Sequence, residues 1–355
     1  MASCPAAGIG AEDLVPAGLV EADRLDEIRQ VAGEFAVALT ADMAELIDSA
    51  DAADPIAAQF IPKAAELAPA PEERDDPIGD ERWSPVPGIV HRYPDRVLLK
   101  PILLCPVYCR FCFRREVVGK QATMLDQPAL RRAFDYISDR PQIWEVIVTG
   151  GDPFLLSPRR ISQIVGALDQ MPQLGVIRFH TRVPVVDPGR VSPTLVEALA
   201  AQKALYVVIH ANHPRELTAK ASEALLRLSR AGIPLLSQTV LLRGVNDDAA
   251  VLEQLFRNLV AKRVKPYYLH HADLARGTSH FRTGVAVGQA LTRSLRGRIS
   301  GLCQPTYVLD IPGGYGKVPL TPCAATPDRT SGGWIIEDGA GVKHPYPPDP
   351  IECVE

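Results

Sequence analysis

Residues 204–242 read ALYVVIHANHPRELTAKASEALLRLSRAGIPLLSQTVLL, and this stretch holds the pattern that decides the fold. An apolar run (204–210) comes first, an amphipathic stretch of helical length (221–232) follows, and a second apolar run (233–242) comes last. Strands that are apolar throughout and alternate with helices are typical of a parallel sheet covered by helices. The stretch therefore predicts one strand–helix–strand unit.

The same alternation recurs over most of the chain from Arg92 onward. Further apolar runs are RVLLKPILL (96–104), WEVIVTG (144–150), LGVIRFHT (174–181), KPYYLHHAD (265–273) and TYVLDIPGG (306–314). Further stretches with helical spacing are 128–140, 157–171, 192–202 and 248–263. Six or seven such units favour an α/β fold with a partial or full (β/α) TIM-like barrel, where function collects at the C-terminal ends of the strands.

The two flanks of this barrel differ from it in composition. Residues 1 to about 63 predict helices, because EADRLDEIRQVAGEF (21–35) and LTADMAELID (39–48) have apolar positions at helical spacing. Residues 64–88 are rich in proline and acids and predict an irregular crossing segment. We expect an N-terminal region over 1–85, the barrel over 86–311 and a C-terminal segment over 312–355.

Composition excludes several classes of protein. Apolar residues make up 46% of the 355, and the net charge of −4 with short basic stretches argues against a nucleic-acid surface. We expect no membrane span, since no apolar run approaches the ~20 residues that one requires. The first residues lack the pattern of a signal peptide, and seven cysteines are an odd count, so we expect a cytoplasmic protein.

Polar residues stand where almost every apolar run ends. They are Thr149 to Asp152, His180 with Arg182, His210 with Asn212, Gln238, His270 with Asp273, and Asp310. One or two such residues would be ordinary loop caps. Six strands ending in this way predict a functional site at the mouth of the barrel.

Three cysteines lie close together in CPVYCRFCFRRE (105–116), after the first barrel strand. Cys105, Cys109 and Cys112 follow a C-x3-C-x2-C pattern, which can hold a [4Fe–4S] cluster and leave one iron open to another ligand. A structural zinc ion would need a fourth ligand, and the nearest histidine, His91, precedes the strand. The cluster is favoured, and zinc is the alternative.

With Phe111 as its aromatic residue, the motif resembles the C-x3-C-x-aromatic-C signature of radical S-adenosylmethionine (SAM) enzymes. That resemblance implies that SAM completes the cluster and yields a 5′-deoxyadenosyl radical, which takes hydrogen from the substrate. TGGDP (149–153) resembles the glycine-rich strand end that meets SAM in these enzymes. The resemblance thus places Gly150, Gly151 and Asp152 beside that cofactor.

A lysine stands among glycines in DIPGGYGKVPL (310–320). The segment is not a Walker A loop, because that motif requires Ser or Thr where this chain has Val318. Lys317 could form a Schiff base with pyridoxal phosphate (PLP), and it could equally be a surface lysine after a turn. The residues alone leave both alternatives open.

Several motifs together resemble the lysine 2,3-aminomutase family. PVPG, HRYPDRVLL, LLRGVND, KPYY, HFRT and PGGYGK occur in the family's order between about Leu39 and Leu320. The resemblance implies a radical SAM barrel with a C-terminal segment in which Lys317 binds PLP. It also implies that Arg92, Tyr93 and Arg96 hold the PLP phosphate, and that His210 and Gln238 contact SAM.

The same resemblance implies an amino acid substrate. Arg114 corresponds to the residue that binds its carboxylate, and Asp273 and Asp310 to the two that bind the ε-ammonium of lysine. A pair of carboxylates favours a cationic side chain and repels glutamate. We therefore expect an isomerase of lysine metabolism that converts L-lysine to L-β-lysine. From the residues alone, Asp310 could instead cap a turn and Asp273 could be a solvated loop acid.

The chain also departs from the family's pattern. The central zinc cysteine of the clostridial type corresponds to Asp248, and the tail offers only Cys323 and Cys353, so we predict no zinc of that kind. The cysteine motif, with Phe113 after its last cysteine, resembles the branch of the family that makes β-lysine for elongation factor P. Three alternatives remain. The substrate could be arginine or ornithine, the product could serve the modification of elongation factor P, or the chain could be a non-catalytic iron–sulfur protein. An electron donor such as flavodoxin or ferredoxin is expected, and a homo-oligomer stays open.

Overall fold

The computed structural model describes residues 8–119, 124–321, 323–338 and 341–347. The α-helices are α1 (Leu25–Glu34), α2 (Ala41–Ala44), α3 (Pro55–Phe60), α4 (Gln127–Ser138), α5 (Pro158–Asp169), α6 (Val183–Val186), α7 (Pro193–Glu197), α8 (Ala219–Arg230), α9 (Ala249–Ala261) and α10 (Val285–Leu295). The strands are β1 (Ile89–Tyr93), β2 (Arg96–Ile102), β3 (Glu145–Gly150), β4 (Val176–Thr181), β5 (Ala204–His210), β6 (Leu235–Leu241), β7 (Val264–His271), β8 (Thr306–Ile311), β9 (Gly316–Pro319), β10 (Ala325–Pro327), β11 (Trp334–Glu337) and β12 (Lys343–Tyr346).

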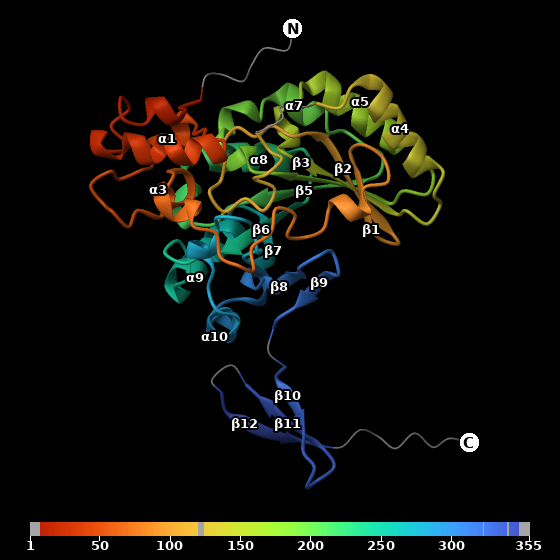
Figure 1. Cartoon of the computed structure of the whole chain (residues 1–355). Coiled ribbons are helices and arrows are strands. Elements are labelled where there is room, and N and C mark those ends of the chain that lie inside the picture. The colour runs from red at the N-terminus through yellow and green to blue at the C-terminus, as the bar shows by residue number, and fades with distance from the viewer. Residues whose placement is uncertain (1–7, 120–123, 322, 339–340, 348–355) are drawn as a thin grey trace.

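One sheet carries the fold, with strands in the order β1 to β9. Neighbouring strands from β2 to β8 are parallel, while β1 and β9 pair antiparallel with the strands at the two ends of this set. Helices α4, α5, α7 and α8 lie together along one side of the sheet, and α9 and α10 lie beside β7 and β8 (Figure 1). The partial (β/α) barrel predicted from the sequence is confirmed.

Local sequence explains why the barrel helices begin where they do. A side-chain oxygen at each N-cap accepts a hydrogen bond from a backbone N–H of the first turn, which satisfies a donor that the helix itself cannot. The capping residues of α4, α5, α7, α8 and α9 are Asp126, Ser157, Ser192, Thr218 and Asp248. Asp248, the residue at the family's zinc-cysteine position, is thus a helix cap here.

Buried strands supply the core. Val207, Val208 and Ile209 of β5 are fully buried although they point to both faces of the sheet. Their burial on both faces is what a parallel sheet covered by helices requires. The strand bounds agree with the run ALYVVIH from its first residue to its last.

Two predicted helical regions are shorter than expected. Helix α7 ends at Glu197 and not near residue 202, because the Asp169 carboxylate accepts hydrogen bonds from the backbone N–H groups of Gln202 and Lys203 and fixes the turn into β5. Residues 8–63 contain short helices joined by turns. The Asp54 carboxylate accepts hydrogen bonds from the first turn of α3, so a new helix begins there after α2 has ended.

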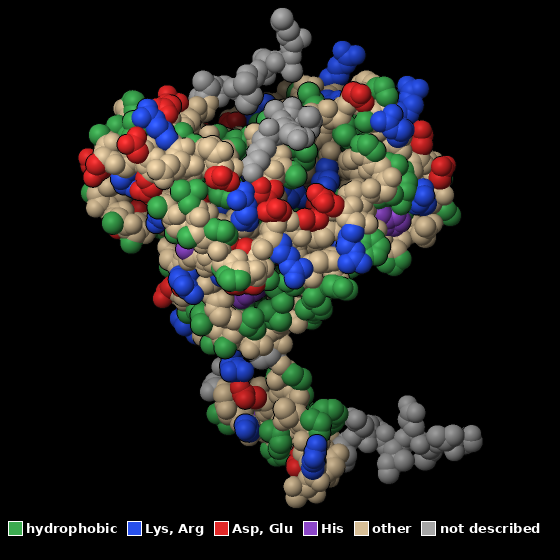
Figure 2. Space-filling model, in the orientation of Figure 1, with side chains coloured by type: hydrophobic (Ala, Val, Ile, Leu, Met, Phe, Trp, Pro, Cys, Tyr) green, Lys and Arg blue, Asp and Glu red, His purple; other side chains and the backbone are tan. Residues whose placement is uncertain are grey.

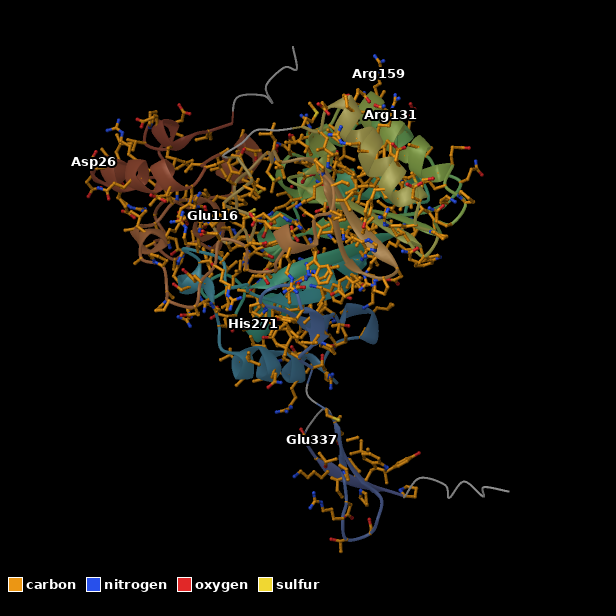
Figure 3. All side chains as sticks on the ribbon, turned by 45° about the vertical axis from the view of Figure 1, so that its right-hand side comes forward. Asp26, Glu116, Arg131, Arg159, His271 and Glu337 are labelled. Carbon is orange, nitrogen blue, oxygen red and sulfur yellow. The ribbon has the colours of Figure 1, made fainter. Side chains whose placement is uncertain are left out.

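A small antiparallel sheet, β10 to β12, follows the barrel in sequence and lies apart from it (Figure 1). Glu337, labelled in Figure 3, lies on this tail sheet and is 3.6 Å from Arg293 of α10. On the face shown in Figure 2, acidic and basic side chains are interspersed over the barrel. Within the described ranges no helix has the length and apolar character needed to cross a membrane.

Candidate active site

The cysteine loop follows β2 and is anchored by a buried carboxylate from the N-terminal region. Glu66, in a short 3-10 helix (Ala64–Leu67), accepts hydrogen bonds from Arg110 at 2.6 Å and from Arg115. Arg110 also donates to the carbonyl of Ala36 at 2.8 Å. Two guanidiniums of the cysteine loop therefore share one fully buried acid, which fixes the loop between its cysteines and just after them.

The three cysteine thiols lie in this loop, near one another and largely buried. Burial raises the pKa of Cys105 well above its usual range and that of Cys112 to about 11, and the neighbouring thiols add to both shifts. Iron would reverse this, because a coordinating metal stabilises the thiolate. The guanidinium of Arg182 lies 2.7 Å from the sulfur of Cys109 and would favour the same anionic form.

The spacing of potential metal ligands agrees with a cluster better than with one ion. In the described part of the chain, no three His, Cys, Asp or Glu side chains converge as a single metal ion would require. In a [4Fe–4S] cluster each cysteine binds a different iron, so the three sulfurs need not meet at one point. The donor set therefore fits the cluster, with one iron left for a non-protein ligand.

The end of β3 lies against the chain that enters the cysteine loop. The backbone N–H groups of Gly151 and Asp152 donate to the carbonyls of Ile102 and Leu104, at 2.7 and 2.8 Å. Gly150 has φ +118°, and a Cβ on Gly151 would lie 2.2 Å from the Leu104 carbonyl oxygen. Only glycine fits here, so TGGD and the cysteines are brought side by side as the SAM expectation requires.

The Asp152 side chain serves a local structural purpose. Its carboxylate accepts hydrogen bonds from the Thr181 hydroxyl and the backbone N–H groups of Arg182 and Val183, at 2.7 to 3.2 Å. It therefore fixes the turn after β4. A contact of Asp152 with SAM, implied by the resemblance, would have to use its backbone.

His210 and Gln238, the other two expected SAM contacts, are paired across β5 and β6. The ring of His210 lies 5.7 Å from that of Phe111 in the cysteine loop. His210, and Gln238 beside it on the next strand, are therefore close to the expected cluster. Burial lowers the pKa of His210 to about 3, which keeps its imidazole neutral. Its Nε2 lies 3.1 Å from the side-chain oxygen of Asn212.

Lys317 lies on β9, directly opposite Asp310 of β8. Its ammonium group forms an ion pair with Asp310 and lies 3.3 Å from Nδ1 of His270. The backbone N–H of Lys317 donates to the hydroxyl of Tyr93 at 2.7 Å. The fold therefore brings the glycine-rich segment to the arginine-rich hairpin β1–β2, as the resemblance implied.

Arg92 and Arg96 lie on either side of Tyr93 and differ in their partners. Arg92 pairs with Asp310 at 3.4 Å and with Asp80 at 3.7 Å, and its buried Nε has no hydrogen-bond partner. Arg96 lies 3.8 Å from the Tyr93 ring centroid and pairs with the neighbouring Asp95. A guanidinium with an unused buried donor beside Lys317 fits the phosphate and amine chemistry of PLP.

The expected substrate residues belong to the same charged group. Arg114 donates from Nε to Asp80 at 2.8 Å. Burial, together with repulsion by the charge of Asp310, raises the pKa of Asp273 to about 7. Asp273 has no hydrogen bond to another residue in the described ranges, so its carboxylate is available for a cationic ligand.

Three contributors to this site were missed or left without a role by the sequence analysis. Asp80 and Lys100 join the charged group, and their side chains lie 3.4 Å apart. His270 contacts Lys317, and the buried Nε2 of its ring has no partner. Adjacent residues of a strand face opposite sides of the sheet, so its neighbour His271, labelled in Figure 3, points away from Lys317. The Nδ1 atom of His271 lies 2.7 Å from the Tyr307 hydroxyl. Polar residues in a proline-rich segment gave no signal that would place Asp80 here.

Comparison with known proteins gives a family match and close relatives. Residues 99–255 match the model of the radical SAM superfamily. The chain is 41% identical over 295 residues to the L-lysine 2,3-aminomutase of Clostridium subterminale, which covers 83% of this chain and 71% of that protein. The same identity holds over 297 residues for the L-lysine 2,3-aminomutase of Methanococcus maripaludis, covering 83% and 69%. A glutamate 2,3-aminomutase of Clostridioides difficile is 37% identical over 295 residues, covering 83% and 70%.

Solved structures show a looser likeness. A radical SAM methyltransferase from Sphaerobacter thermophilus superposes with a TM-score of 0.44 and 24% identity, covering 62% of this chain and 68% of the other.

Proposed function

Because the chain belongs to the lysine 2,3-aminomutase family of radical SAM enzymes, we propose that it converts L-lysine to L-β-lysine. As a member of that family it is an isomerase that uses a [4Fe–4S] cluster, SAM and PLP. When bound, these groups supply a hydrogen-abstracting radical and a conjugated carrier for the migrating nitrogen.

One observation carries the proposal: a continuous path of charged contacts joins Lys317, the lysine proposed to bind PLP, to the cysteine loop. It runs from Lys317 to Asp310, Arg92, Asp80 and Arg114. These residues come from β9, β8, β1, the crossing segment and the loop itself. A reaction that needs two cofactors and a substrate in fixed geometry requires such an arrangement, because its rate depends on orientation.

Three residues of this path, together with neighbouring side chains, have a task in the proposed reaction. Lys317 would hold PLP, with Arg92, Tyr93 and Arg96 around its phosphate. Arg114 would bind the substrate carboxylate through paired hydrogen bonds. The ring of His270, whose pKa is held low by burial and by Lys317, would stay neutral beside the Lys317 amine.

Charge supports a cationic substrate side chain. Asp273 and Asp310 repel one another, and an ammonium between them would relieve that repulsion. Glutamate, the substrate in the name of one relative, would add a third negative charge there. Arginine and ornithine carry the same charge as lysine and remain the alternatives.

The deciding experiment is an anaerobic assay of the reconstituted protein with PLP, SAM, reductant and L-lysine. Formation of β-lysine, separated by chromatography, would establish the reaction and the substrate together. Cleavage of SAM with lysine returned unchanged would refute lysine as substrate, and arginine, ornithine and glutamate would then be tried in turn.

Two finer points belong to the proposal. An electron donor such as flavodoxin or ferredoxin would reduce the cluster, and this requirement fits a cytoplasmic location. Assembly into a homo-oligomer would be read from the mass of the reconstituted protein in solution.

A further inference from the structure

Asp80 is a buried carboxylate surrounded by three cations. Its Oδ2 accepts from Arg114 at 2.8 Å and lies 3.4 Å from the Lys100 ammonium, while Oδ1 lies 3.7 Å from Arg92. Only 6% of the residue is exposed. An acid in this position is either a competitor for the substrate carboxylate or a support for the groups that bind it.

The segment around Asp80 is built to hold it in place. Asp76 accepts hydrogen bonds from the backbone N–H groups of Asp80 and Glu81, both at 2.9 Å, and Ser84 donates to the Asp80 carbonyl at 2.7 Å. Gly79 has φ +66°, and a Cβ there would lie 2.8 Å from Gly313. The turn is therefore fixed from both sides and also contacts the glycine loop that leads to Lys317.

The contact uses one part of the Arg114 guanidinium and leaves another free. Asp80 accepts from Nε, whereas the two terminal nitrogens of Arg114 donate to no residue within the described ranges. The planar guanidinium can bind one carboxylate through Nε and a second through its terminal nitrogens. Fixing Nε restricts the rotation of the group and aims its terminal nitrogens at a ligand.

The balance of charge favours support over competition. Four cations lie in the group, namely Arg92, Lys100, Arg114 and Lys317, against the carboxylates of Asp80, Asp310 and Asp273. Even with all three acids charged the cations are in excess, so Asp80 does not need to leave for a substrate carboxylate to bind.

We propose that Asp80 is a positioning residue that orients Arg114 to grip the substrate α-carboxylate. This inference rests on the proposed function and deepens it, since it assigns the crossing segment a part in recognising the α-carboxylate. It predicts that loss of the Asp80 charge weakens the binding of an amino acid but not of its amide.

The test compares L-lysine with L-lysinamide as probes of the PLP-loaded protein. Binding is followed by the change in PLP absorbance, without SAM, so that no turnover occurs. Asp80→Asn should weaken lysine binding by about ten- to a hundredfold and leave lysinamide binding nearly unchanged. Glu81→Gln, an acid-to-amide change on the exposed neighbour, should alter neither.

A double-mutant cycle separates positioning from general damage. In an Arg114→Ala background, Asp80→Asn should have no further effect on lysine binding. An equal loss there, or an equal loss for lysine and lysinamide, would overturn the inference. Tighter lysine binding by Asp80→Asn would also overturn it, because Asp80 would then be a competitor.

Two arms keep the result interpretable. If Asp80→Asn does not fold, Asp80→Glu retains the charge on a longer side chain and should recover most of the preference for lysine over lysinamide. Should the wild-type protein bind arginine or ornithine and not lysine, the proposed substrate is wrong. The comparison of that amino acid with its own amide would still test Asp80.

Discussion

Lys317 is the residue on which the proposed chemistry depends most directly. Its amine forms an ion pair with Asp310, lies 3.3 Å from Nδ1 of His270, and would be the group that bonds PLP. Lys317→Ala should abolish covalent PLP binding and lower activity on the order of a thousandfold. Borohydride reduction and peptide mass analysis should find PLP on the Lys317 peptide of the wild type.

The matched control for this substitution is Lys343→Ala, on an exposed position of β12. It should retain PLP absorbance and activity. Full activity with bound PLP in Lys317→Ala would show that the Schiff base forms elsewhere.

Asp273 should make substrate binding depend on pH. Because its pKa is raised to about 7, the group is mainly neutral at pH 6 and mainly a carboxylate at pH 8. Only the carboxylate attracts a cationic side chain, so affinity for lysine should fall about tenfold from pH 8 to pH 6. The measurement is a titration of PLP absorbance with lysine at each pH.

Substitutions identify the source of this pH dependence. Asp273→Asn should bind lysine weakly and with a flatter pH profile. Asp139→Asn, an exposed acid at the end of α4, should keep the wild-type profile. An unchanged profile in Asp273→Asn would assign the titration to another group.

At the scale of elements, the cysteine loop depends on the 3-10 helix that carries Glu66. This carboxylate is the shared partner of Arg110 and Arg115, all three being buried. Burial raises the pKa of Glu66, but the two arginines outweigh it and the net shift is downward. The ion pairs therefore stabilise the fold above the ordinary pKa of Glu, and their contribution is lost as pH falls through the lowered folded value.

Glu66→Gln should destabilise the protein because it leaves two buried cations without a countercharge. We expect a loss of about 3–5 kcal/mol in urea unfolding, together with a lower iron content after reconstitution. Glu45→Gln, which removes an exposed partner of Lys220, should change neither quantity. Normal stability and full iron loading in Glu66→Gln would show that the loop is held by other contacts.

At the scale of the whole molecule, the tail sheet follows the barrel, and within the described residues an ion pair between Arg293 and Glu337 links the two. The β8–β9 ladder that carries Lys317 ends before the tail, and the backbone N–H of Leu320 still donates to the Tyr307 carbonyl of β8. The ion pair between Arg293 and Glu337 is exposed, and such pairs contribute little.

Deletion of residues 324–355 should therefore leave the barrel folded, with PLP absorbance and iron content retained. We expect a melting temperature within about 4 °C of the full chain, the shift that roughly 1 kcal/mol produces in a protein of this size. Loss of PLP binding on deletion would show that the tail supports Lys317. A smaller number of subunits per particle, calculated from the mass in solution, would instead place a subunit interface on the tail.

The sequence by itself determined the barrel and predicted which groups react. Apolar runs such as ALYVVIH that alternate with amphipathic helices favour strands covered on both faces, and caps such as Ser157 and Thr218 fix where helices begin. The cysteine spacing and Lys317 were visible because their chemistry depends on residue type within a short segment. The roles of Arg114, Asp273 and Asp310 stay predictions, although the structure brings them to one site.

Only the tertiary structure decided which charged groups meet. Asp80 lies in a segment without periodicity, and its partners Arg92, Lys100 and Arg114 are set by how that segment crosses the barrel. The sequence did not predict helix α10, because its glycine and β-branched residues have low helix propensity. In the fold, close packing of Gly288 against Tyr307 offsets that low propensity. Side chains distant in sequence form contacts that local propensity cannot encode, and these contacts hold the two cofactor regions together.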